Sequence, residues 1–167
     1  QRHQGVWDAS KYSLVTSATY TGSLAVTNVK YVRIDGLQIE NSGSKASQAM
    51  GIYMQLNSVG EYQYSNNIIR ATGAGTAATY NTGIMFDSAD YAYSLKAWNN
   101  IVYNFFEGIY SGYSSSASFI GYNNTFYTLA TGFGIRLNYA GTVRLKNNLV
   151  NGRAGSTNYS FESGAPA

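Results

Sequence analysis

The sequence predicts an all-β fold, a right-handed parallel β-helix solenoid of about five three-strand coils. Three observations carry this prediction. A doubled asparagine recurs along the chain, a glycine followed by an alternating apolar stretch recurs between the doublets, and helical periodicity is missing throughout. Repeats of 20–50 residues with alternating strands are typical of solenoids.

The first repeated signature is the asparagine doublet. Its second residue advances by 33, 24 and 24 residues, and the doublets are Asn66-Asn67, Asn99-Asn100, Asn123-Asn124 and Asn147-Asn148. The second signature is a glycine before an apolar strand, at Gly51, Gly83, Gly108 and Gly134. A degenerate earlier copy runs from residue 23 to residue 37. The two signatures alternate, which indicates five copies of one structural unit.

Each copy holds three short alternating stretches, which in the last full copy are residues 135–137, 143–145 and 149–150. Alternation of this kind predicts strands with one buried face. Three strands in about 24 residues leave no room for a crossover helix, so we expect a three-sided coil that pairs in parallel with the next coil. Tandem hairpins are disfavoured, because the only hairpin-type dipeptides are Asp35-Gly36 and Asn151-Gly152.

The phase of the repeat predicts which side chains point into the core. On the first strands they are Leu24, Val26, Ile52, Met54, Ile84, Phe86, Ile109, Ile135 and Leu137. On the second strands they are Val32, Ile34, Tyr62, Tyr64, Leu95, Ala97, Phe119, Val143 and Leu145, and on the third strands Ile39, Ile69, Val102, Phe126 and Val150.

We expect the second asparagine of each doublet at a corner, in the left-handed backbone conformation that asparagine tolerates. Stacked side chains would then form a structural ladder of Asn67, Asn100, Asn124 and Asn148, with Leu37 at the first rung. In these residues the chain resembles the pectate-lyase-like right-handed parallel β-helix superfamily (Asn-ladder type), and residues 22–161 are expected to form the parallel β-helix. That fold hosts enzymes, adhesins and viral spikes, so the resemblance implies a fold rather than an activity.

The termini flank this solenoid. Residues 1–21 are expected to form an N-terminal cap or partial coil, with Trp7 covering the opening. Residues 162–167 form a tail that is too short to cover Leu145 and Val150. We therefore expect the carboxyl end to continue into further sequence or to self-associate through the solenoid ends. Because the chain begins with Gln1, we also expect it to be processed or excised from a longer protein.

Composition limits the function. Only 11% of residues are charged, the net charge is +3, cysteine is absent and 16 residues are tyrosine. No basic cluster predicts nucleic-acid binding and no apolar run predicts a membrane span. A surface of Tyr, Asn, Ser and Thr is of the kind that meets a polysaccharide or other glycan, although strands favour Tyr and Thr for their own reasons. The expected location is extracellular, cell-surface or virion.

The predicted binding site is the outer face of the first strands. One exposed row comprises Tyr53, Met85, Tyr110 and Arg136, and Gln55, Asp87 and Asn138 lie beside it. Two insertions, at residues 41–49 and 71–82, each come directly before the first strand of the next copy, and both therefore lie on the same edge of the solenoid. Such loops are a usual place for binding residues.

Catalysis has weaker support. Asp87 and Asp90 are close enough in sequence to hold a cation such as Ca²⁺, and no other cofactor is expected. The resemblance implies that lyases of this fold bind substrate along the first strands, with carboxylates on Ca²⁺ and a Lys or Arg as base. Arg136 would be two coils, roughly 10 Å, from Asp87. We therefore favour a non-enzymatic β-helical module that is glycan-binding or structural; the alternative is a fragment of a polysaccharide lyase or glycoside hydrolase.

Overall fold

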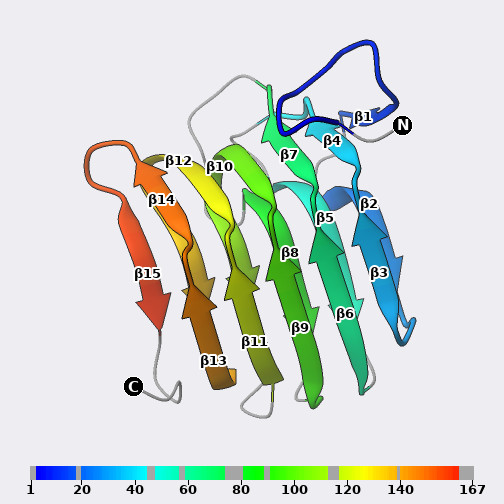
Figure 1. Ribbon diagram of the computed structural model, residues 1–167, viewed down its shortest axis with the longest axis vertical. Helices are drawn as coiled ribbons and strands as arrows, with labels where there is room; N and C mark the ends of the chain where they lie inside the picture. Colours follow the sequence, from blue (N-terminus) through cyan, green and yellow to red (C-terminus); the bar gives the residue numbers. More distant parts are fainter. Residues whose placement is uncertain are drawn as a thin grey trace.

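The described part of the chain is all β. The structure, a computed structural model, describes residues 3–17, 20–44, 48–56, 59–73, 81–88, 91–112, 117–138 and 140–161. Within these ranges the regular elements are strands, and each strand pairing is parallel (Figure 1). No helix long and apolar enough to cross a membrane occurs in them. This architecture fits a β-solenoid.

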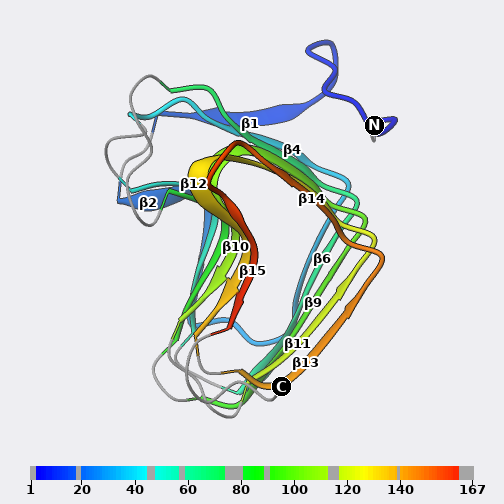
Figure 2. The same ribbon diagram turned by 90° about the vertical axis from the view of Figure 1, so that its left-hand side faces the viewer.

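The strands superpose in three stacks around one interior (Figure 2). The first-strand stack contains β2 (Thr21–Thr27), β5 (Ala49–Leu56), β8 (Thr82–Ser88), the ends of β10 (Ile101–Ser111) and β12 (Thr125–Leu137), and β15 (Thr157–Phe161). The second-strand stack contains β3 (Val32–Asp35), β6 (Gly60–Ser65), β9 (Tyr93–Trp98), β11 (Ala117–Tyr122) and β13 (Ala140–Lys146). The third-strand stack contains β1 (Ser13–Thr16), β4 (Gln38–Asn41), β7 (Ile68–Ala71), the beginnings of β10 and β12, and β14 (Leu149–Gly152).

The long strands β10 and β12 differ from the three separate strands per copy that the sequence predicts. Each runs from the third-strand stack into the first-strand stack without a loop, and the pairing register shifts near residues 103–107. The backbone turns this corner with a left-handed residue, Asn104 (φ 65°) in β10 and Thr131 (φ 60°) in β12. The insertions that separate the strands in early copies are absent here, so the two strands become one.

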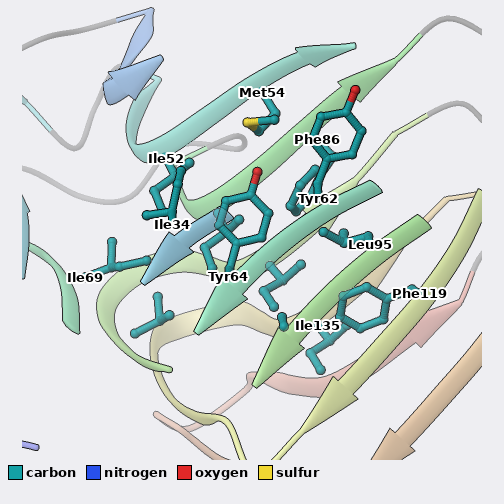
Figure 3. Close-up of a cluster of buried hydrophobic side chains, with 14 of the residues drawn as sticks. Ile34, Ile52, Met54, Tyr62, Tyr64, Ile69, Phe86, Leu95, Phe119 and Ile135 are labelled. Carbon is teal, nitrogen blue, oxygen red and sulfur yellow. The ribbon is translucent and has the colours of Figure 1, made fainter. Parts of the chain in front are cut away.

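The core contains every side chain that the repeat phase places inside. All of them either belong to one buried cluster or pack against it. Aromatic and aliphatic residues from different copies meet across the interior (Figure 3), and Tyr64 contacts Phe86 edge to face at 5.4 Å between ring centroids. The hydrophobic effect of this continuous core favours the stacked arrangement, because no single copy can bury its own apolar face.

The asparagine ladder is continuous in the structure. Asn67, Asn100 and Asn124 each donate from Nδ2 to the Oδ1 of the next rung, at 3.0, 3.0 and 2.9 Å. The backbone N–H of each rung donates to the same oxygen, at 3.0–3.1 Å. The Leu37 N–H donates to Asn67 Oδ1 in the same way. The ladder thus satisfies corner amides that the strands leave unpaired.

The expected left-handed conformation of the second asparagine is wrong. The positive φ angles belong to the first residue of each doublet, at 55° for Asn66, 56° for Asn99, 53° for Asn123 and 55° for Asn147. Gly36, with φ 76°, takes this place in the earliest copy. The two residues have different roles: the first turns the chain, and the second makes the hydrogen bonds of the ladder.

The recurring glycine lies where the backbone of a first strand comes very close to side chains of a third strand. A Cβ on Gly83 would collide with the Val102 side chain of the third-strand stack, and one on Gly108 would collide with Phe126. The first strand therefore starts in direct contact with core side chains of the third strand, where only glycine fits.

In the amino-terminal segment β1 pairs in parallel with β4. The expectation that Trp7 covers the opening is wrong. Its ring lies 3.6 Å from the guanidinium carbon of Arg70, and Asp8 exchanges hydrogen bonds with Gln38. Figure 2 shows this segment beside the third-strand stack rather than across the end of the coil.

Candidate functional site

The outer face of the first-strand stack carries two rows of side chains. Strand register aligns Tyr53 with Met85, Met85 with Tyr110, and Tyr110 with Arg136. A second row begins with Thr82 and Glu107, and Glu107 in turn pairs with Phe133. The predicted alignment of the first row therefore follows directly from the repeat spacing.

A pocket of about 220 Å³ opens on this face. Its lining residues are Tyr20, Gln48, Met50, Tyr53, Met85, Asp87 and Tyr110. Four of them belong to the predicted binding row and its neighbour. The volume is below the roughly 300–1,000 Å³ of drug-sized sites, so it suits a small ligand or one terminal group of a larger one.

The predicted exposure of this row is wrong at two positions. Met85 is 8% exposed and Tyr110 is 3% exposed, because they form a second buried cluster with Met50 against which Tyr53 packs. Neighbouring strands lie only about 4.8 Å apart, so large side chains in one row cover one another. The result is a compact apolar floor instead of an open row.

Polar groups surround that floor. The Tyr53 hydroxyl donates to Asp87 Oδ2 at 3.1 Å. Burial raises the pKa of Tyr53, and the negative charge of Asp87 raises it further. The charge of Asp87 also contributes to raising the pKa of Tyr93 to about 12, after the larger effect of burial. Asp87 therefore gives this side of the pocket a negative potential.

A buried ion pair lies along the same face. Glu107 is 0% exposed and accepts from Thr82 Oγ1 at 2.7 Å and from Arg136 Nη1 at 3.1 Å. The Arg136 guanidinium carbon also lies 5.5 Å from the Tyr110 ring and 5.1 Å from the Phe133 ring. Arg136 is thus held in place by one carboxylate and two aromatic rings.

The remaining predicted binding residues do not line the pocket. Gln55 is exposed and pairs in register with Asp87. Asn138, expected to be exposed, is buried, and its Nδ2 donates to the Tyr110 hydroxyl at 3.1 Å. Its contact positions one ring of the pocket floor.

The metal prediction rests on Asp87 and Asp90, and Asp90 lies outside the described residues. Within the described ranges no group of three or more His, Cys, Asp or Glu side chains gathers in a way that could hold a metal ion.

Sequence reasoning missed Tyr20, Gln48 and Met50. Gln48 lies in the first insertion and Met50 directly precedes the Gly51 signature, so the insertion was a usable signal. The missed burial of Glu107 had a signal too, because Glu107 directly precedes Gly108 of the same signature.

The two carboxylates of this face are far apart. Glu107 pairs with Thr82, which lies five residues before Asp87 on β8, and five strand residues span about 16 Å. Paired glycosidase carboxylates lie about 5–9.5 Å apart. These two groups therefore do not form such a pair.

Comparisons with known proteins return no match, whether with protein-family models, curated proteins or solved structures.

Proposed function

We propose that the chain is a right-handed parallel β-helix of about five coils, of the pectate-lyase-like Asn-ladder type. The support is the threefold stacking of parallel strands, the unbroken run of asparagine hydrogen bonds from Asn67 to Asn148, and the single core that all copies share.

We further propose that the protein is a non-enzymatic glycan-binding module of an extracellular, cell-surface or virion protein. One observation carries this proposal: a sugar-sized pocket with tyrosine and methionine on its floor and amide and carboxylate groups at its edge. Aromatic rings offer flat apolar faces while keeping a polar tip, and a few placed polar groups give orientation. The strands beneath hold the floor rigidly.

The alternative, a fragment of a polysaccharide lyase or glycoside hydrolase, has less support. The separation of Asp87 from Glu107 does not suit a carboxylate pair, and Arg136 is engaged by Glu107. Incubation with polysaccharides and measurement of new reducing ends or unsaturated products tests this alternative. Product formation that Asp87→Asn abolishes would overturn the non-enzymatic proposal.

An oligosaccharide array tests binding. Tyr53→Ala removes a ring and a hydroxyl from the pocket, and we expect it to weaken binding of the strongest hit about tenfold, equivalent to about 1.4 kcal/mol. Tyr122→Ala is the matched control, because Tyr122 is exposed on the second-strand stack. Equal loss in both variants, or an array without any hit, would contradict the proposal.

A second candidate function is end-to-end self-association. At the carboxyl end Leu149 is 60% exposed and Phe161 is 45% exposed. A hollow of about 330 Å³ lies there, lined by Leu145, Lys146, Asn147, Asn148, Tyr159 and Phe161. Among the described residues, β13, β14 and β15 each pair with a strand on one side, and an open strand edge favours pairing with another chain. Light scattering should show that the molecular mass rises with protein concentration, and Leu149→Lys should reduce this rise. A mass that stays monomeric at high concentration would contradict this function.

A further inference from the structure

The pocket has one charged group among its described lining residues. Asp87 is that group, and the other lining residues are three tyrosines, two methionines and a glutamine. A ligand that enters therefore meets a carboxylate, aromatic rings and polarisable sulfur atoms.

Among the described residues of this face, Arg136 carries a positive charge that is paired with a carboxylate. Arg136 approaches the Tyr110 ring, but its charge is paired with the fully buried Glu107 carboxylate. This pair contributes little net charge, so Asp87 supplies the charge among the described residues that line the pocket.

The tyrosine rings of the pocket favour binding of a cation. The negative face of an aromatic ring attracts an ammonium group, and the attraction grows when water is excluded. Methionine sulfur is soft and adapts to the shape of a ligand. The Tyr53 hydroxyl donates to one oxygen of Asp87 at 3.1 Å, which orients the carboxylate. An acidic sugar would instead bring a second negative charge to Asp87.

We infer that the glycan recognised by this pocket carries a free, positively charged amino group, as in a glucosamine unit that is not acetylated. The ammonium pairs with Asp87 and lies against the tyrosine rings, while the sugar ring covers the methionine floor. This inference rests on the proposed glycan-binding function and names its substrate class.

Calorimetry at pH 6 tests the inference with three oligomers of equal length: glucosamine, N-acetylglucosamine and glucose. We expect the glucosamine oligomer to bind at least tenfold more tightly than the other two, and added salt to weaken it. Asp87→Asn, which keeps the size of the side chain, should abolish this preference while circular dichroism stays unchanged. Glu61→Gln is the matched control, since Glu61 pairs with Lys96 on the second-strand stack.

The outcomes separate the two proposals. Equal binding of all three oligomers, or a preference that survives Asp87→Asn, would overturn the amino-sugar inference and leave glycan binding intact. Absence of binding by every oligomer here and on the array would overturn the glycan-binding function itself. Binding of a lysine-rich peptide with no sugar bound would overturn both.

Discussion

Removal of one rung of the asparagine ladder should destabilise the whole solenoid. Asn100 is fully buried, and its side chain makes four hydrogen bonds. In Asn100→Ala the Asn67 N–H loses its acceptor and the Tyr64 carbonyl loses a donor, whereas Asn124 Oδ1 keeps the backbone N–H of residue 100. Each buried group left without a partner costs about 1–3 kcal/mol. We expect a loss of about 2–5 kcal/mol, a large fraction of the roughly 5–15 kcal/mol that stabilises a typical domain.

The assay is urea unfolding followed by circular dichroism, and Asn99→Gly is the adjacent control. Asn99 is exposed with φ 56°, a conformation that glycine adopts readily. We expect this control to change the unfolding free energy by less than about 0.5 kcal/mol. A loss below about 1 kcal/mol in Asn100→Ala, with an unchanged m value, would refute the reasoning. So would an Asn100→Gly variant as stable as Asn99→Gly, because the hydrogen bonds of the Asn100 side chain would then contribute nothing to stability.

Three further predictions concern stability. Gly83→Ala should lower the unfolding free energy by at least about 1–3 kcal/mol, because the added methyl would collide with a core valine. Gly112→Ala, whose Cβ would lie 3.4 Å from its nearest neighbour, should cost less. Equal costs would contradict the explanation that only glycine fits at residue 83. Glu107→Gln should cost about 3 kcal/mol, since it removes the buried carboxylate that pairs with Arg136. An unchanged stability in urea unfolding would show that the pair contributes nothing. The pKa of Tyr93 in the folded protein is raised to about 12 from an ordinary 10. The stabilisation that this shift gives is complete below pH 10 and is lost as the pH rises to 12, so the unfolding free energy should fall by about 2–3 kcal/mol over that range. An equally steep fall in Tyr93→Phe would contradict this assignment.

The strand pairing could be predicted from sequence because the repeat spacing sets the register. Once Gly51, Gly83, Gly108 and Gly134 are aligned, every residue after them falls in a row, and the core residues follow from alternation. The ladder residues followed from the same spacing.

Exposure of the site was not predictable in this way. Whether Met85 and Tyr110 are open to water depends on Met50, which belongs to a different copy and lies outside the alternating stretch. The position of Trp7 depends on a single contact with Arg70, and no repeat in the sequence signals it. The left-handed residue of each doublet could not be assigned from composition either, since both residues are asparagine.

The most direct test of the account is a nuclear magnetic resonance titration with the oligosaccharide that binds most strongly on the array. We expect the largest amide shift changes at Gln48, Tyr53, Asp87 and Tyr110, and contacts between sugar protons and the ring protons of Tyr53 and Tyr110. The second-strand stack should stay unchanged. Shift changes concentrated on the second-strand stack or at the carboxyl end, with these four residues unaffected, would contradict it.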